Sequence, residues 1–375
     1  MQSQRNSSIE TLRILSMLMI ISHHFIVLSQ VKTLELPISV NKLFSDLLLR
    51  PGGKIGVTVF FLISAYFLCQ ETVNTKRNIK RIVALDAQML FYSLSITFIF
   101  LILDYKLVST TTIVQSFIPL ISRMWWYPTS YIIFLLLSPF ITVSLRRIGK
   151  KNHFNLVLIV SFLWGLIAGL LPKIYLDLSS QNMIIFCYLY ILTSFYVWYL
   201  KPVSRRFSLT LIGLGLFLIW SNILVCSYLY QKTGSSLFLH LEDSFISHEW
   251  KLPVAFTAFG LFSLFVSFQY YSKSINVIAK CTFGVFLIHN HPVSSSFLSH
   301  TLFNMSNTFN RISYPLIAIS IILLVFILCI LIDLIRQQIF KITLDRHINY
   351  ITAVIFNTLF VLKHRIQQLM YTHEL

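Results

Sequence analysis

Long apolar stretches recur along the whole chain, and short polar breaks that carry most of the charge separate them. About 20 apolar residues are needed for a helix to cross the hydrocarbon core of a bilayer. Ten stretches fit this pattern, although the second and the fifth are short. They cover residues 12–30, 55–70, 83–103, 128–145, 155–171, 182–200, 208–230, 252–272, 281–301 and 313–333. The sequence therefore predicts an all-α integral membrane protein, a bundle of about ten transmembrane helices.

The amount of apolar surface excludes a soluble fold. Of the 375 residues, 56% are hydrophobic and only 11% are charged, and the mean hydropathy is +0.75. No soluble domain of this size has enough interior to bury so many apolar side chains. The sequence shows no internal repeat, low-complexity linker or soluble domain. We therefore expect a membrane-embedded domain over residues 1–335 and a basic tail over residues 336–375.

The distribution of positive charge predicts the orientation of the bundle. A formal net charge of +17 would suggest a nucleic-acid partner for a soluble protein, but in a membrane protein Lys and Arg accumulate in cytoplasmic segments. With the N-terminus inside, 19 of the 30 Lys and Arg residues fall in the N-terminal segment, the cytoplasmic breaks or the tail. We expect both termini in the cytoplasm, and contact with the lipid bilayer rather than with nucleic acid.

Two polar segments each leave an alternative open. The tail contains INYITAVIFNTLFVL, residues 348–362, which is short for a span and interrupted by polar residues. An amphipathic helix in the headgroup region is favoured there, with an eleventh span as the alternative. The outer segment 231–251 is expected to be a solvated loop, with contact to a polar substrate as the alternative. Its ionisable residues are His240, Glu242, Asp243, His248 and Glu249.

The first span contains ionisable residues where a membrane helix should be most apolar. Its stretch RILSMLMIISHHF, residues 13–25, begins with an arginine and includes two adjacent histidines. At 100° per residue, Arg13 and His24 share nearly the same helix face and lie about 16 Å apart. Glu10 lies one turn from Arg13 on a similar face and is expected to orient its guanidinium. His23 points about 100° away from this stripe.

These residues can be explained either by membrane anchoring or by a functional role. Arg13 alone is explained as an anchor, because Lys and Arg at the inner end of a span reach the headgroups. His24 is harder to explain in this way, since a histidine near mid-membrane needs hydrogen-bond partners and such groups usually line a pathway or a site. Burial disfavours the charged imidazolium. We therefore expect a neutral His24 that accepts a proton, as a general base must.

The second span begins with GGKIGVTVFFLISAYFL, residues 52–68. Its glycines permit close approach of another backbone, and Ser64 is the most polar group deep inside it. A small-residue interface between helices explains the same pattern.

The third span is preceded by TKRNIKRI, residues 75–82, in which Lys76, Arg77, Lys80 and Arg81 are clustered. The cluster is either an instance of the positive-inside bias or a phosphate clamp, because Arg and Lys hold phosphoryl oxygens through charge-assisted hydrogen bonds.

The ninth span opens with KCTFGVFLIHNHP, residues 280–292. His289 follows Lys280 by about 13 Å of helix rise, a depth comparable with that of His24. Two histidines at similar depth in different spans predict a shared site. The five cysteines fall in or beside apolar segments without CxxC spacing, so we predict neither a metal site nor a disulfide framework.

Taken together, these stretches resemble the membrane-bound acyltransferase-3 family, the bacterial O-acetyltransferases that modify surface glycans. The resemblance covers most of residues 8–335. Its most specific element, an arginine followed after ten residues by a histidine, is matched by Arg13 and His24. Three further stretches carry it: GGKIGVTVFFLISAYF, with Ala65 in place of the usual glycine after Ser64, WWYPTSYIIFLLLSPF (125–140), and GVFLIH (284–289).

One element departs from the family pattern. The family has two arginines separated by two residues, whereas here Arg81 fits the second position and Asn78 occupies the first. Arg77 and Arg81 are one helical turn apart, so the clamp is expected to be rebuilt from neighbouring residues.

The resemblance implies an O-acetyltransferase of the bacterial cytoplasmic membrane. The acyl donor would be acetyl-coenzyme A, and the acceptor a hydroxyl of a cell-surface glycan, an exopolysaccharide or its lipid-linked precursor. In this interpretation His24 is the general base and Arg13 positions the donor or polarises its carbonyl. Ser64 and His289 shape the reaction chamber, while Arg77, Lys80 and Arg81 bind the donor phosphates.

Two other functions would use similar residues. A transporter or flippase of a glycan or lipid-linked sugar also needs intramembrane Arg and His, but the sequence lacks the paired, glycine- and proline-broken helices typical of alternating-access folds. A glycan polymerase usually depends on arginines in large outer loops, whereas the distinctive residues here lie in the first and ninth spans.

Overall fold

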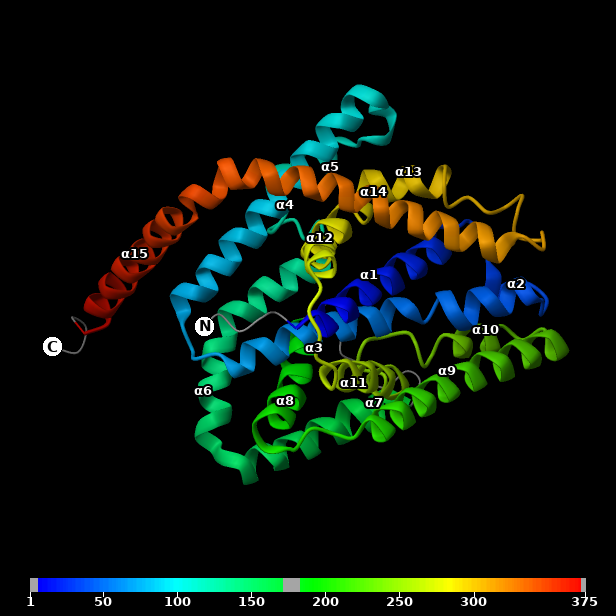
Figure 1. Cartoon of the computed structure of the whole chain (residues 1–375), viewed down its shortest axis with the longest axis horizontal. Helices are drawn as coiled ribbons and strands as arrows, with labels where there is room; N and C mark the ends of the chain where they lie inside the picture. Colours follow the sequence, from blue (N-terminus) through cyan, green and yellow to red (C-terminus); the bar gives the residue numbers. More distant parts are fainter. Residues whose placement is uncertain (1–5, 171–182, 372–375) are drawn as a thin grey trace.

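The computed structural model describes residues 6–170 and 183–371, which are almost wholly helical, with no strand among them (Figure 1). The all-α prediction is confirmed. In chain order the helices are α1 (Ser7–Leu28), α2 (Val40–Leu43), α3 (Gly52–Gln70), α4 (Thr75–Leu103), α5 (Thr110–Phe117), α6 (Trp126–Val160), α7 (Ala168–Leu170), α8 (Met183–Tyr199), α9 (Arg205–Thr233), α10 (Ser236–Glu242), α11 (Leu252–Val266), α12 (Lys273–His289), α13 (Pro292–His300), α14 (Tyr314–Ile342) and α15 (Leu344–Tyr371). π-Helical segments at Phe44–Leu49 and Ser161–Ile167 join α2 to α3 and α6 to α7. Single 3₁₀ turns form at Thr33–Glu35 and Tyr105–Leu107.

Six helical stretches among the described residues are long and apolar enough to cross a membrane. They are Ser7–Leu28, Val40–Gln70, Thr75–Leu103, Trp126–Leu170, Arg205–Thr233 and Tyr314–Ile342. Two shorter apolar helices are Met183–Tyr199 and Leu252–Val266. The chain is therefore a multi-pass membrane protein. The count of ten spans and the cytoplasmic position of both termini stay predictions.

The fourth and fifth predicted spans lie within one long helical stretch. Gly149 breaks it, with φ 74° and ψ 173° inside α6, a conformation that glycine adopts without the steric cost of a Cβ atom. The predicted spans 128–145 and 155–171 flank this kink. Residues 171–182, where the fifth predicted span ends and the sixth begins, lie outside the described residues.

Three glycines bring α3 against α1. A Cβ atom added to Gly52 would lie 2.7 Å from the carbonyl oxygen of Met19, and one added to Gly56 would lie 2.6 Å from that of Ser16. A Cβ on Gly53 would lie 2.3 Å from Cγ of His23. The glycines therefore serve the close backbone approach expected from the sequence, and they fix the histidine-bearing part of α1 against α3.

A buried acidic residue joins α14 to α4 and α12. Asp333 is fully buried and pairs with Arg336, whose Nη2 lies 2.8 Å from Asp333 Oδ1. The Tyr92 hydroxyl donates to the same carboxylate at 2.7 Å. Gly284 of α12 leaves room for it, because an added Cβ would lie 1.9 Å from Asp333 Oδ1. This network holds α12, and hence His289, in place.

A layer of buried ion pairs, the outer ion-pair layer, ties the segment around α10 to the start of the second predicted span. Lys42 Nζ lies 2.9 Å from Asp46 Oδ2 and 3.2 Å from Glu242 Oε1, and the three side chains are at most 1% exposed. Lys54 Nζ lies 3.0 Å from Glu249 Oε1. Burial raises the pKa of Glu242 and of Glu249 above their ordinary values.

The expectation of a solvated loop at 231–251 is therefore wrong for Glu242 and Glu249, which lie buried against the bundle. Their partners are Lys42 and Lys54, roughly two hundred residues away in the chain, so the local sequence does not reveal the pairing.

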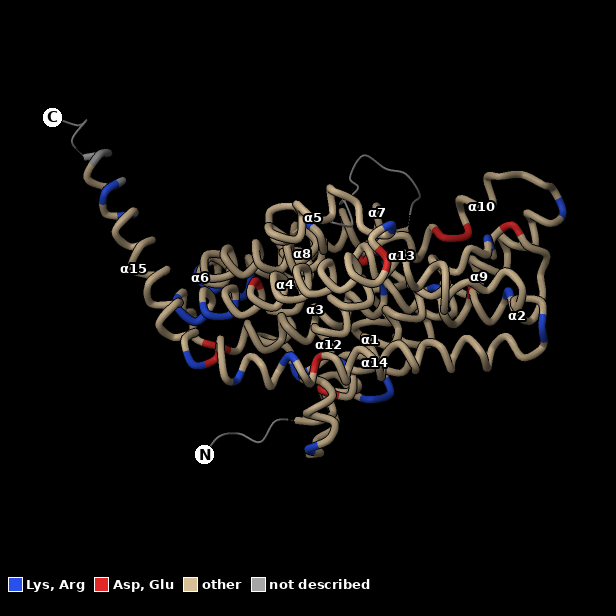
Figure 2. The backbone as a smooth tube through the Cα atoms, turned by 90° about the horizontal axis from the view of Figure 1, so that it is seen from above, with Lys and Arg blue, Asp and Glu red and all other residues tan. Residues whose placement is uncertain are grey.

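The tail forms one helix, α15, which leaves the bundle at the end where Lys and Arg gather (Figures 1 and 2). Near its start Asn349 accepts a hydrogen bond from Lys80 of α4, with Nζ and Oδ1 2.7 Å apart. Farther along, the apolar side chains Leu359 and Phe360 are exposed. The helix is not among the candidate spans, and its place in the headgroup region stays a prediction.

Candidate active site

The two histidines predicted at similar depth are in direct contact. His24 Nδ1 of α1 lies 2.9 Å from His289 Nε2 of α12, and the ring centroids are 5.1 Å apart. The His289 ring is also fixed on its other side, where Nδ1 lies 2.6 Å from the carbonyl oxygen of Val285. His289 is 1% exposed.

These contacts determine where the protons lie in the neutral pair. A carbonyl oxygen can only accept, so His289 Nδ1 carries a proton and donates it to Val285. His289 Nε2 is then an acceptor, and His24 Nδ1 must donate to it. The remaining nitrogen, His24 Nε2, keeps its lone pair. His289 thus holds His24 in the tautomer that a general base needs, as hydrogen-bond partners do for catalytic and metal-bound histidines.

His23 has a different place. Its Nδ1 donates to the backbone carbonyl of Arg50 at 2.7 Å, and its ring packs over Gly53. His23 therefore helps to hold α1 against the start of α3 and does not join the contact between His24 and His289.

Arg13 lies on the same face of α1, toward the other end of the helix. Its Nε is 3.8 Å from Glu10 Oε2, the pairing expected from the sequence. Its guanidinium carbon lies over the ring of Phe60 at 5.8 Å from the centroid. The arginine side chain is 22% exposed, whereas Glu10 is only 2% exposed. The carboxylate is therefore buried in the bundle, and the guanidinium extends from it toward a more open region.

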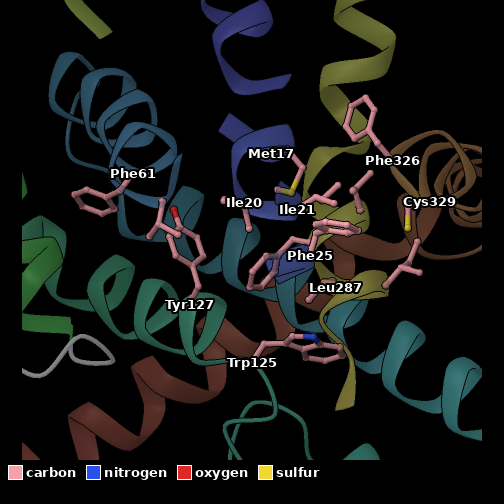
Figure 3. Packing of buried hydrophobic residues seen from close by; sticks show 14 of the residues in the cluster. Met17, Ile20, Ile21, Phe25, Phe61, Trp125, Tyr127, Leu287, Phe326 and Cys329 are labelled. Carbon is pink, nitrogen blue, oxygen red and sulfur yellow. The ribbon is translucent and has the colours of Figure 1, made fainter. Parts of the chain in front are cut away.

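A small apolar hollow, the central hollow, adjoins the helix face between Arg13 and His24. The residues that line it are Met17 and Ile20 of α1, Val57 and Phe60 of α3, Tyr127 of α6, and Phe283 and Phe286 of α12. Figure 3 shows the side chains of Met17 and Ile20 on α1, with Tyr127 facing them from α6. On one side of the hollow the Arg13 guanidinium lies over the ring of Phe60. On the other side Phe286 packs against His289, with ring centroids 6.0 Å apart.

Ser64 lies beside this hollow on α3. Its hydroxyl donates to the carbonyl oxygen of Phe60 at 3.2 Å. Because Phe60 lines the hollow, Ser64 is held one helical turn from a residue of its wall.

Two of the predicted phosphate-binding residues share one carboxylate. Glu71 Oε1 accepts from Arg81 Nη2 at 2.5 Å, and Oε2 accepts from Arg77 Nη1 at 3.1 Å. Asn78, at the position where the family has arginine, accepts from Arg81 Nη1 at 3.3 Å and donates to the Ser138 hydroxyl at 3.1 Å. Asn78 thus helps to orient Arg81 instead of supplying a charge.

A second small hollow lies beside this pair of arginines and includes Glu71, Asn74 and Asn78 in its lining. Lys80 faces elsewhere, because its ammonium group is bonded to Asn349 of α15. The structure therefore brings together Arg77 and Arg81 but not Lys80.

Within residues 6–170 and 183–371, no group of three or more His, Cys, Asp and Glu side chains is arranged to hold a metal ion. The site combines the hydrogen-bonded imidazoles of His24 and His289 with an apolar hollow near Arg13. Arg77 and Arg81 lie near a second hollow. That combination suits proton transfer beside a largely apolar, anion-tipped ligand.

The model of the acyltransferase-3 family, described as an acyltransferase domain, matches residues 6–334, which is most of the chain. The chain belongs to the acyltransferase-3 family. Curated proteins and solved structures give no match. As a member of this family the chain is a membrane acyltransferase. The matched range contains every predicted site residue.

Sequence reasoning missed several residues in and around this candidate site. Tyr127 belongs to the quoted stretch WWYPTSYIIFLLLSPF, but nothing in its local pattern separates it from the other aromatic residues. Glu71 is an isolated acidic residue ahead of the basic cluster, a signal that could have revealed the ion pairs. Asp333 is the last residue of the tenth predicted span, but the helix continues to Ile342, and with that longer span the rule that drew attention to His24 would have found it.

Proposed function

We propose that this acyltransferase moves an acetyl or other short acyl group from acyl-coenzyme A to a sugar hydroxyl. The acceptor would be a bacterial cell-surface glycan, an exopolysaccharide or its lipid-linked precursor, and the enzyme would reside in the cytoplasmic membrane. The observation that carries the proposal is the 2.9 Å contact of His24 with His289 beside a hollow. Of the residues that line this hollow, Phe286 packs against His289 and Phe60 lies under Arg13.

The donor is assigned from charge and polarity. Coenzyme A carries phosphates, which Arg77 and Arg81 would bind in exchange for Glu71. Both side chains are partly exposed, at 49% and 32%, so they are open to a ligand. With the predicted orientation they lie on the cytoplasmic side, where acyl-coenzyme A is made. The apolar central hollow would take the uncharged acyl end of the donor.

His24 acts on the acceptor. A sugar hydroxyl is a weak nucleophile unless its proton is removed as the new bond forms. In the proposed step His24 Nε2 takes that proton while the hydroxyl oxygen attacks the thioester carbon. Collapse of the adduct breaks the C–S bond, and the proton on His24 passes to the leaving thiolate. General-base assistance of this kind typically contributes about 10²–10⁴-fold in rate.

Thiol release distinguishes this function from transport. Purified protein is mixed with acetyl-coenzyme A, with and without a glycan acceptor, and free thiol is measured. An acyltransferase releases thiol in step with acetylation of the acceptor. A flippase or transporter of glycan moves its cargo across vesicles and leaves the thioester intact, and that result would overturn the proposal.

Mass spectrometry of surface glycan identifies the acceptor. Glycan from a strain that lacks this protein should be lighter by one acyl group for each modified repeat. The mass difference names the acyl group, and the fragment that carries it names the sugar. Unchanged glycan in the deletion strain would point to another acceptor class.

A further inference from the structure

Tyr127 is a buried tyrosine whose hydroxyl has no hydrogen-bond partner within the described part of the chain. The side chain is 6% exposed. Three other buried tyrosine hydroxyls have partners: Tyr92 donates to Asp333, Tyr190 bonds with Thr142, and Tyr314 bonds with Ser45. A buried hydroxyl without a partner costs free energy, so the group at Tyr127 lacks the structural purpose that the others have.

The ring of Tyr127 is held firmly in place. It packs edge-on against Phe60 of α3, Phe186 of α8 and Phe286 of α12, with centroids 5.9, 5.2 and 6.1 Å away. It also stacks with Tyr131, one turn along α6, at 6.2 Å. A phenylalanine could make all these contacts. The position of the hydroxyl is thus set by its surroundings, although no protein group uses it.

Tyr127 is one of the residues that line the central hollow, and its hydroxyl is buried beside it. In Figure 3 the ring extends from α6 toward the space between Phe61 and Ile20. Two of its ring neighbours define the ends of the site, because Phe60 carries Arg13 and Phe286 packs on His289. Tyr127 therefore lies between the cation and the histidine pair, where the reacting carbonyl of a donor would be held.

We propose that Tyr127 is a further catalytic residue, whose hydroxyl donates a hydrogen bond to the carbonyl oxygen of the thioester. This inference rests on the proposed acyl transfer. When the sugar oxygen bonds to the carbonyl carbon, the C=O electron pair moves onto that oxygen and His24 takes the sugar proton. The Tyr127 O–H stabilises the resulting oxyanion and keeps its own proton. The pair then returns as the C–S bond breaks and the thiolate leaves with the proton from His24.

A donor fixed in advance toward a developing oxyanion is among the larger single contributions to acyl transfer. In this pocket the donor hydrogen bond is made only when substrate is bound. The unpartnered state of Tyr127 in the free protein is therefore what the role requires.

The test is Y127F, which removes one oxygen atom and retains the packing of the ring. We expect kcat for acetyl transfer to fall by about 10²-fold, with little change in KM for acetyl-coenzyme A. The thermal midpoint should stay the same or rise, because the variant buries one fewer unpaired hydroxyl. A purely structural tyrosine would give the opposite pair of results.

Y190F is the matched control. It removes the hydroxyl of another buried tyrosine in the same aromatic cluster, but one that is bonded to Thr142 and does not line the hollow. It should lower the thermal midpoint and leave kcat near that of the wild type. Wild-type kcat in Y127F would overturn the proposal, as would a fall in kcat explained by a lower midpoint.

Ligand binding gives a second readout that needs no turnover. A ketone analogue of the donor, with CH₂ in place of sulfur, is compared with an analogue that has no carbonyl oxygen. Wild-type protein should prefer the ketone, and Y127F should lose this preference. An equal preference in both proteins would overturn the role of Tyr127. If wild-type protein transfers acetyl but Y127F is unimpaired, only this inference fails; if the wild type transfers none, the proposed function fails first.

Discussion

Two groups of ion pairs lie at opposite ends of this bundle, and they differ in burial. In the outer ion-pair layer, Lys42, Asp46 and Glu242 are at most 1% exposed. At the other end Arg77 and Arg81 share Glu71, and all three side chains are between 29% and 49% exposed. The first group is enclosed by protein, whereas the second can exchange its carboxylate for another anion.

This difference separates structural charges from charges available to a ligand. A buried charge that loses its partner is strongly destabilising, so Lys42 and its carboxylates hold α2 and α10 together. Partly exposed pairs contribute little to stability. The pairs of Glu71 with Arg77 and Arg81 are better explained by the proposed phosphate binding, in which Glu71 keeps the two arginines aligned in the absence of ligand.

The largest effect on stability is expected from Lys42→Ala. It leaves Glu242 buried without its cation, whereas Asp46 keeps Arg50 at 2.9 Å, and the loss should cost about 3–5 kcal/mol of unfolding free energy. Denaturation in detergent measures the loss. Lys32→Ala is the control, because Lys32 pairs with Glu35 at the surface, and its stability should stay that of the wild type. A Lys42 variant with normal stability but no acyl transfer would show that the buried ion pairs serve function and not stability.

The next effect is on catalysis. His289→Leu removes the acceptor that holds His24 in its tautomer, and we expect kcat to fall about 10–10²-fold, as for other residues that orient a reacting group. KM for the donor should change little. His300→Leu serves as control, since His300 is exposed on α13. Equal kcat in both variants would mean that the contact of His24 with His289 is structural only.

A smaller effect is expected from Arg81→Gln. Loss of one charge-assisted hydrogen bond to phosphate should raise KM for acetyl-coenzyme A about tenfold while leaving kcat nearly unchanged. Dephospho-coenzyme A derivatives show which phosphate is held. Lys80→Gln tests the remaining sequence prediction, and its bond to Asn349 of α15 leads us to expect a smaller rise. The assignment fails if KM is insensitive to Arg81.

The smallest effect is a dependence of stability on pH. Burial raises the pKa of Glu249 above its ordinary value, more than Lys54 lowers it. The folded state therefore holds this proton more tightly than the unfolded state, so the contribution is complete below about pH 4.5 and is lost as pH rises through the raised pKa. Glu249→Gln should flatten this part of a plot of thermal midpoint against pH. An unchanged slope would exclude Glu249 as its source.

The sequence predicted what depends on spacing along one helix. Counting depth in two spans predicted a shared site for His24 and His289, and one turn of helix predicted the pairing of Arg13 with Glu10; the direct contact of the two histidines came from the structure. What it could not predict depends on segments far apart in the chain. Lys42 and Glu242 meet only after the bundle has formed, so local composition wrongly suggested that Glu242 and Glu249 are solvated.

The same limit applies to the site itself. The basic cluster of residues 75–82 was evident, but the sequence could not show that Lys80 turns to α15 while its neighbours turn to Glu71. Tyr127 stands in an aromatic stretch whose members look alike in sequence. Only the packing of α1, α3, α6 and α12 around one hollow distinguishes it.

The central claim is that His24 removes the acceptor proton, and His24→Gln tests it most directly. Glutamine can still donate a hydrogen bond to His289 but cannot take up a proton. With membrane insertion and donor binding verified, the account predicts that acetyl transfer to glycan falls about 10²–10⁴-fold. A variant that transfers acetyl groups at the wild-type rate would contradict it.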